Sequence, residues 1–270
     1  MLTVALAAAI QIAVHARAVQ PGELVVLAIT LPEHRERIKV RAFGHDIAAF
    51  ALSDREWQAL VGVDLDTKPG PYAVTIDAGA GLAATETLTV AAKTFPTRRL
   101  TVDEDFVTPP PSVQERIERD SQLLASTWQH PAAERLWSAP FVRPVPQAAN
   151  SRFGTRSIFN GKPRNPHGGA DFLSPAGTPI HAPAGGRVAV ARDLYFSGNT
   201  VVIDHGLGVF SMLAHLSSIG VHEGDRVDAG QVVGLVGATG RVTGPHLHWA
   251  VRANGARVDP LSVLTLLGQR

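Results

Sequence analysis

Residues 244–252 read GPHLHWAVR, a stretch that predicts both a strand and a site. Along a β-strand successive side chains point to opposite faces, so residues two apart share a face. His246 and His248 therefore project from one face, while Leu247 and Trp249 project from the other. Two imidazoles on one face indicate a metal site or a proton-transfer site, provided that other residues supply partners.

The region around this stretch is rich in glycine and contains seven of the eleven histidines. Five of its segments alternate or run apolar between glycine-containing turns, which is typical of strands. These segments are 187–192, 199–204, 208–213, 231–236 and 247–252. They lie too close together for crossover helices, so we expect a largely antiparallel β-domain over residues 148–270.

The first part of the chain also predicts strands, which makes the expected fold mainly β. Segments rich in β-branched residues are separated by turns such as Pro21-Gly22 and Pro69-Gly70. These segments are 23–29, 37–43, 47–52, 71–76 and 85–91. Their spacing predicts a small β-sandwich of immunoglobulin-like type over residues 19–106.

A linker is expected between these two domains, over residues 107–147. It opens on the stretch TPPPS at 108–112, and further prolines follow after residue 130. Between them, Ser112 and Glu115 have capping-box spacing, and apolar residues recur on one face of a helix over 112–129. We therefore expect one helix followed by a stiff, proline-rich connection.

The composition and the N-terminus bear on location and partners. The 270-residue chain has a net charge of +1, which gives no reason to expect nucleic acid as a partner. It has no cysteine, so disulfides and thiolate metal ligands are excluded. An apolar run over residues 2–14 precedes Ala16-Arg17-Ala18, a pattern that predicts a signal peptide over residues 1–18. We accordingly expect an exported protein of the periplasm or cell envelope.

Partners for the paired histidines occur in PHGGADF at 166–172, where Asp171 follows His167 by four residues. The glycines between them allow the backbone a tight path, so both side chains can turn towards one ion. Two imidazoles and a carboxylate form a ligand set that zinc accepts, and a catalytic zinc keeps its fourth position for water. His248 is the natural third ligand.

Three stretches together resemble the LytM/lysostaphin-type zinc endopeptidases of family M23, which cut peptidoglycan peptides. They are SRFGTRSIFNGKPRNPHGGADF, LAHLSSI and GATGRVTGPHLHWAVR, and the resemblance covers roughly residues 148–262. It implies one zinc per chain, bound by His167, Asp171 and His248. His215 and His246 would then be the two catalytic histidines that are not ligands.

The resemblance also implies a reaction and an alternative to it. The expected activity is hydrolysis of peptidoglycan cross-links, with D,D-cross-links favoured over glycyl bridges. Some relatives that lack metal ligands instead activate other wall hydrolases, so a non-catalytic binding regulator is the alternative. A structural zinc domain is a third interpretation, although such sites usually close with four protein ligands. The chain departs from the family at Leu213, where a tyrosine is common.

Other residues receive weaker assignments. Asn160, Arg164 and His205 are expected near the substrate groove. The stretch GATGRVTG lacks the G-K-[ST] ending of a phosphate-binding loop, so its glycines are assigned to a turn. Residues 19–147 are a candidate intramolecular regulator that restrains activity. The sequence assigns no oligomeric state.

Overall fold

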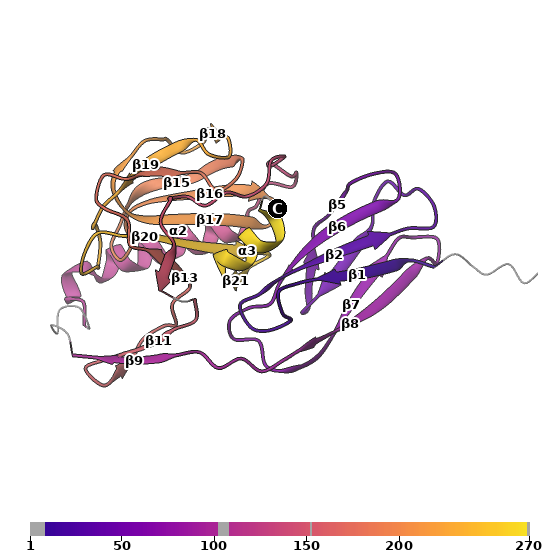
Figure 1. Ribbon diagram of the computed structural model, residues 1–270, viewed down its shortest axis with the longest axis horizontal. Helices are drawn as coiled ribbons and strands as arrows, with labels where there is room; N and C mark the ends of the chain where they lie inside the picture. The colour runs from indigo at the N-terminus through magenta and orange to yellow at the C-terminus, as the bar shows by residue number, and fades with distance from the viewer. Residues whose placement is uncertain (1–8, 102–107, 152, 269–270) are drawn as a thin grey trace, which may run out of the picture.

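Two four-stranded antiparallel sheets form a sandwich in the first part of the chain (Figure 1). The computed structural model describes residues 9–101, 108–151 and 153–268. One sheet has the order β1 (Gln11–His15), β2 (Leu24–Thr30), β6 (Glu56–Gly62), β5 (Ala49–Ala51). The other has the order β4 (His45–Ile47), β3 (Lys39–Ala42), β7 (Gly70–Asp77), β8 (Ala83–Val90). The five predicted segments are all found as strands, whereas β6 was missed.

The sandwich begins earlier than predicted. Strand β1 pairs with β2 from Gln11 opposite Thr30 to His15 opposite Val26. Arg17 forms an ion pair with Glu23, and Ile10 is buried in the sandwich core. The predicted cleavage point after Ala18 thus lies inside the folded domain, and cleavage there would remove an edge strand. Residues 1–8 of the predicted signal peptide lie outside the described residues.

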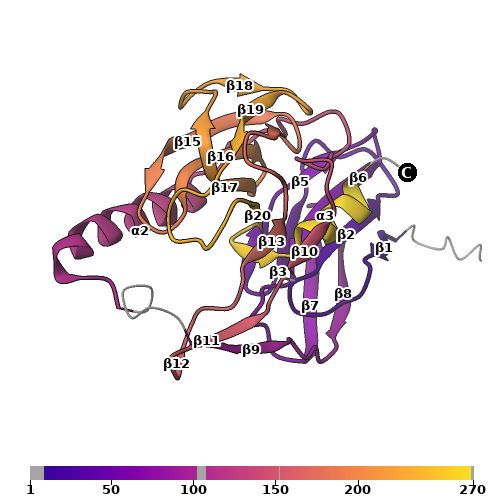
Figure 2. The same ribbon diagram turned by 60° about the vertical axis from the view of Figure 1, so that its left-hand side comes forward.

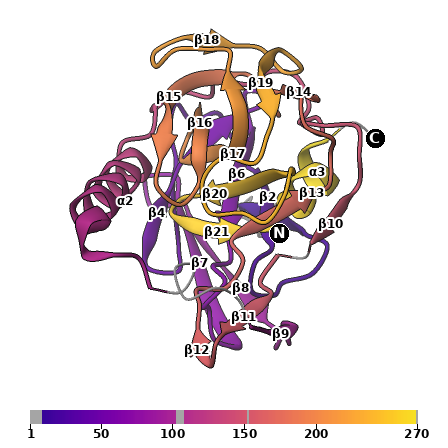
Figure 3. The ribbon, with the colours of Figure 1, turned by 90° about the vertical axis from the view of Figure 1, so that its left-hand side faces the viewer.

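The second part of the chain is built on a ten-stranded sheet (Figure 3). Its main path is β10 (Ala149–Ser151), β13 (Gly169–Phe172), β20 (Leu247–Ala253), β17 (Val209–Ile219), β16 (Gly198–Gly206), β15 (Gly186–Leu194), β18 (Arg226–Val227). Its remaining strands are β14 (Pro179–His181), β19 (Val232–Val236) and β21 (Ala256–Val258). The paired strands of this sheet run antiparallel, as predicted.

The predicted helix is present, but the predicted linker is not a linker. A 3₁₀ turn, η1 (Pro111–Val113), leads into α2 (Gln114–Gln129), which lies against the ten-stranded sheet (Figure 2). The capping box does not form: Ser112 lies within the turn, and no side chain caps α2. Trp128 packs edge-on against Phe210 of β17, so the helix covers this sheet rather than connecting two domains.

The proline-rich segment after α2 belongs to the core of the second domain. Trp137, Phe141 and Val145 are at most 8% exposed and share one apolar cluster with the ten-stranded sheet. The Phe141 N–H donates to Leu267 O at the end of α3 (Pro260–Leu267). The domain boundary predicted at residue 148 is therefore too late, because residues from 137 onward contribute to this core.

The two domains share apolar contacts as well as polar ones. Leu24, Val26 and Leu60 point away from the sandwich core and join the cluster of the second domain. Both faces of strand β6 are buried as a result. A strand of this kind lacks the alternation of apolar and polar residues that marks a half-buried strand, which is why β6 was missed. At Gly62 an added Cβ would lie 2.6 Å from Ala256 Cβ, so the two backbones approach closely there.

A small three-stranded sheet joins the end of the sandwich to the second domain. Strand β9 (Thr97–Leu100) pairs in parallel with β11 (Arg156–Phe159), which also pairs with β12 (Lys162–Pro163). Figure 1 shows this sheet beneath β13, apart from the sandwich strands. The chain segment that leaves the sandwich therefore passes beside the second domain before α2 begins.

Candidate metal centre and groove

Strand register brings the first three site residues together. In the β13–β20 pair, Asp171 lies opposite His248, and β17 flanks β20 with Ala214 opposite His248. His167 precedes β13 and is anchored by two backbone hydrogen bonds, its N–H to Thr155 O and Gly154 N–H to its own carbonyl. At Gly169 a Cβ would collide with Trp249 O and lie 2.8 Å from the His248 ring. Glycine is thus required between the histidine and the aspartate.

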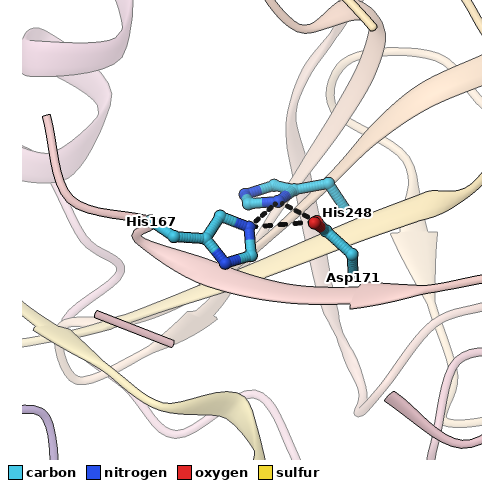
Figure 4. A group of neighbouring side chains, drawn as sticks. All are labelled: His167, Asp171 and His248. Carbon is cyan, nitrogen blue, oxygen red and sulfur yellow. Dashed lines mark hydrogen bonds and ion pairs between the residues drawn. The ribbon is translucent and has the colours of Figure 1, made fainter. Parts of the chain in front are cut away.

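Three side-chain atoms converge at this point (Figure 4). His167 Nε2 lies 3.0 Å from Asp171 Oδ1 and 3.1 Å from His248 Nδ1, and the last two atoms are 2.9 Å apart. Ligand atoms this close fit a single divalent ion, and two nitrogens with one carboxylate oxygen are a zinc-type set. The set predicted from the sequence is the set that the structure brings together.

The local electrostatics suit a cation. Burial would raise the pKa of the Asp171 carboxyl, but hydrogen bonds from His167 and His248 outweigh it and hold that pKa far below its usual range. Burial lowers the pKa of His248, which keeps its imidazole neutral. A metal ligand needs a charged carboxylate and a neutral imidazole, and both are favoured here.

His215 and His246 lie beside this cluster. Their ring centroids are 4.8 Å apart, and His246 Nε2 is 3.8 Å from Asp171 Oδ1. His215 Nδ1 lies 3.0 Å from Thr239 O, and His246 Nδ1 lies 2.9 Å from Gly244 O. A carbonyl only accepts hydrogen bonds, so each Nδ1 carries the hydrogen and, in the neutral ring, each Nε2 is left as an acceptor.

The backbone at His215 is unusual. Its φ is +68°, in the left-handed region that non-glycine residues seldom adopt, and the register of β17 shifts on either side of it. Such conformations cost of order 1 kcal/mol or more and persist where the surroundings enforce them. Burial lowers the pKa of His215 to about 4, with nearby His248 and His246 adding to the effect. The ring is therefore neutral at pH 7.

All five residues line one groove of about 540 Å³. Arg164 also lines it, as predicted, whereas Asn160 lies exposed at the β11–β12 turn and is not among the lining residues. Leu213, which stands where the family often has a tyrosine, is fully buried in the core and does not line the groove.

His205 was wrongly placed in the groove. It is 0% exposed, donates from Nδ1 to Gly185 O and accepts at Nε2 from Ser211 Oγ. Trp249 Nε1 donates to the same hydroxyl. A histidine after a strand looks the same in sequence whether it faces solvent or core, so this burial could not be predicted.

The sequence missed several groove residues. Arg241 lies in the stretch that was assigned to a turn, and Arg98 lies in the other predicted domain. The remaining lining residues that were not predicted are Asn150, Ser157, Phe159, Asn165, Leu173, Phe196, Ser197, Met212, Val242 and Thr243. Strand spacing gives no signal for Arg98, because its contact with the groove depends on the parallel β9–β11 pair.

Known proteins resemble this chain in both sequence and structure. The family model for peptidase family M23 matches residues 165–260. Peptidoglycan DD-endopeptidase ShyA of Vibrio cholerae is 45% identical over 96 residues, and DD-carboxypeptidase/endopeptidase Mpg of Neisseria meningitidis is 46% identical over 97. Each of these alignments covers 36% of this chain and 22% of the relative. The chain thus spans about a fifth of the length of the curated relatives it matches.

A crystal structure matches nearly the whole chain. A putative peptidase M23 from Pseudomonas aeruginosa superposes with a TM-score of 0.74 at 34% identity. The match covers 94% of this chain and 97% of that one, so it includes the sandwich as well as the groove domain. The protein described here belongs to peptidase family M23.

Proposed function

We propose that the chain is a zinc-dependent endopeptidase that hydrolyses peptide cross-links of bacterial peptidoglycan, with D,D-cross-links as the favoured bond. The observation that carries this proposal is one groove holding a His-Asp-His ligand set beside two further histidines. The DD-endopeptidase names of the aligned relatives support the choice of bond. The substrate implies export to the periplasm or cell envelope. Among the described residues, no helix is long and apolar enough to cross a membrane.

His167, Asp171 and His248 would hold the metal. When bound, zinc supplies Lewis-acid polarisation of the scissile carbonyl and lowers the pKa of water towards about 7. The charged Asp171 and neutral His248 provide the protonation states that this binding requires. The third interpretation, a structural zinc domain, is not favoured because the three ligands face a groove large enough for a substrate.

His215 and His246 would move the protons. Each donates from Nδ1 to a backbone carbonyl, which fixes its ring and leaves Nε2 to accept a proton. A neutral imidazole can take the proton of the attacking water and later deliver it to the leaving amine. The lowered pKa of His215 keeps that ring neutral at pH 7, so its Nε2 carries no proton. A protonated ring can also stabilise the developing oxyanion.

The regulator alternative requires a groove that binds without cutting. Relatives proposed for that role lack metal ligands, whereas all the expected ligands and both catalytic histidines are present and converge here. No observation of the described residues favours it over catalysis, so it serves as an outcome of the test.

The test is digestion of purified cross-linked muropeptides by the full chain, with product masses read by mass spectrometry. Zinc-loaded chain is compared with chelator-treated chain, with His246→Ala and with His222→Ala, whose histidine has a 92% exposed side chain. We expect dimers to resolve to monomers only with zinc and His246, and His222→Ala to match the wild type. Cleavage by the zinc-free chain would contradict the proposal. Zinc binding without any cleavage would favour the regulator.

A further inference from the structure

The hydroxyl of Thr239 ties three segments together beside His215. Thr239 lies in the loop 237–246, which connects β19 to β20 and contains the glycine-rich stretch that was assigned to a turn. Its Oγ1 donates to Leu216 O over 2.7 Å and accepts from the Asn199 N–H over 2.9 Å. One side chain therefore links this loop both to β17 and to the start of β16.

The backbone of the same residue holds the His215 ring. Thr239 O accepts the hydrogen of His215 Nδ1 over 3.0 Å, which leaves Nε2 without a hydrogen in the neutral ring. His215 lines the groove, whereas Thr239 is not among the groove-lining residues. Thr239 is therefore placed to act on the groove through the histidine that it holds.

His215 lies at a break in the regular pairing of β17. The register between β16 and β17 shifts beside it, its φ is +68°, and its N–H donates to Ser197 O over 2.9 Å. A conformation of this kind persists only where the surrounding contacts enforce it. The next carbonyl along the strand, Leu216 O, is held by two donors, Thr239 Oγ1 and Asn199 Nδ2. These contacts fix the backbone that carries the imidazole.

The loop also packs closely against the start of β16. Gly198 has a φ of +62°, and a Cβ there would lie 2.3 Å from Thr239 Oγ1. Gly240 has a φ of +76°, and a Cβ there would lie 2.4 Å from Gly198 N. Glycine is thus required on both sides of this contact. A hydroxyl suits such a junction, because it can donate one hydrogen bond and accept another at the same atom.

We propose that Thr239 is a positioning residue, whose hydroxyl fixes the carbonyl that holds the His215 ring and so sets where His215 Nε2 meets the substrate. The proposal rests on the function proposed above, which gives His215 a role in proton transfer. Without the hydroxyl, Leu216 O and the Asn199 N–H would lose this partner, and the loop could move relative to β17. A displacement of about 1 Å can slow a reaction about 100-fold.

The experiment compares the full-length, zinc-loaded wild type with Thr239→Ala and Thr239→Ser on a cross-linked muropeptide. Serine keeps the hydroxyl and alanine does not. Thr265→Ala is the control, because the Thr265 hydroxyl also donates to a backbone carbonyl, Leu261 O, but lies exposed on α3. We expect kcat to fall about tenfold or more in Thr239→Ala with KM nearly unchanged. Thr239→Ser and Thr265→Ala should match the wild type.

Nitrogen NMR of the same proteins, labelled at histidine, reports on the ring without any need for cleavage. The wild type and Thr239→Ser should show His215 in one tautomer, with its hydrogen on Nδ1. Thr239→Ala should show a mixture of tautomers, because the accepting carbonyl is no longer held in place. Metal analysis should find one zinc per chain in every variant, since the three ligands lie on or just before β13 and β20.

Four results would overturn the positioning role. They are an unchanged kcat in Thr239→Ala, an equal fall in Thr239→Ser, a fall in kcat with unchanged His215 signals, and a loss of zinc from Thr239→Ala. If Thr239→Ala does not fold, Thr239→Val takes its place, because valine also lacks the hydroxyl and has nearly the volume of threonine.

Failure of the proposed function gives a different result. A wild type that binds zinc but cleaves no muropeptide would count against that function and leave the NMR comparison to decide the role of Thr239. A tautomer shift in Thr239→Ala that is absent from Thr239→Ser would then support positioning of the ring, and identical His215 signals in all variants would refute it.

Discussion

Asp171 Oδ1 lies 2.9 Å from His248 Nδ1, on residues that face each other across the β13–β20 pair. The backbone register of two neighbouring strands thus sets the distance between two candidate metal ligands. His167 completes the set from the segment just before β13. Sites built on strands hold their ligands more precisely than sites built on loops.

Replacing Asp171 with Asn should remove most metal binding, because a neutral amide cannot supply the charge that zinc requires. We expect zinc affinity to fall by about 100-fold or more, with cleavage falling in parallel. Competition with a chromogenic chelator measures the affinity. Asp193→Asn is the control, since that carboxylate is 57% exposed and pairs with Arg116 away from the groove. Undiminished zinc affinity in Asp171→Asn would remove this residue from the ligand set.

His215→Ala and His246→Ala should separate chemistry from metal binding. Each should still bind one zinc per chain but cleave about 10²- to 10⁴-fold more slowly, because a proton acceptor is lost. Metal analysis of the purified variants checks that zinc is retained. Single-turnover cleavage rates check that the chemistry is slowed. A variant that lost its zinc would show that the replaced histidine is a ligand.

Glycine at position 215 should be better tolerated than alanine by the fold. The φ of +68° strains any residue with a Cβ, whereas glycine adopts it freely. We expect His215→Gly to be more stable than His215→Ala by about 1 kcal/mol, while the two variants cleave equally slowly. Urea unfolding of the metal-free variants measures the difference. Equal stabilities would mean that the strand relaxes when the imidazole is removed.

Asp64 of the sandwich accepts hydrogen bonds from the Arg257 guanidinium of β21, and this contact should make the domain interface sensitive to acid. Burial would raise the pKa of Asp64, but hydrogen bonds from Arg257 outweigh it and lower that pKa from 3.8 to about 2. The folded state therefore favours the charged carboxylate, and this stabilisation is present above about pH 4 and lost as the pH falls towards 2. Between pH 5 and 2.5 the midpoint of urea unfolding should fall less for Asp64→Asn than for the wild type. Equal losses of unfolding midpoint in the two chains would show that Asp64 does not cause the acid sensitivity.

A chain that starts at Ala148 should not fold. It would lack Trp137, Phe141 and Val145, which are buried in the core of the second domain. Loss of one large buried aromatic residue alone costs about 3–5 kcal/mol, and whole domains are stable by only about 5–15 kcal/mol. Circular dichroism and amide proton dispersion report the outcome. A folded, zinc-binding fragment would show that these three residues are dispensable. The predicted restraint by residues 19–147 therefore has to be tested in the full chain.

Local patterns predicted the metal site because its chemistry is local. Asp171 and His248 lie on the paired strands β13 and β20, and His167 and His246 lie just before these same strands, so short spacings in the sequence keep the four residues near one another. Residues whose environment depends on distant partners could not be placed in this way. His205 is buried by packing against Phe141, and Arg98 reaches the groove only through a parallel pairing with residues far along the chain.

The N-terminal boundary was missed for a different reason. An apolar run ending in small residues has the composition of a signal peptide and also that of an edge strand, and β1 is such a strand. The prolines after residue 130 likewise suit either an exposed connection or an irregular buried segment. Pairing with β2 identifies the first segment and burial identifies the second, and both are properties of the assembled fold rather than of the segment.

Leu24, Val26 and Leu60 also limit how this protein can be recombined. Exchanging the sandwich for another module would expose apolar surface on the second domain and on the removed sandwich. The close approach of Gly62 to Ala256 would also be lost. A replacement module would have to reproduce that surface. The exchangeable unit is accordingly the pair of domains, and the Pseudomonas aeruginosa relative, which matches along 97% of its length, retains that pair.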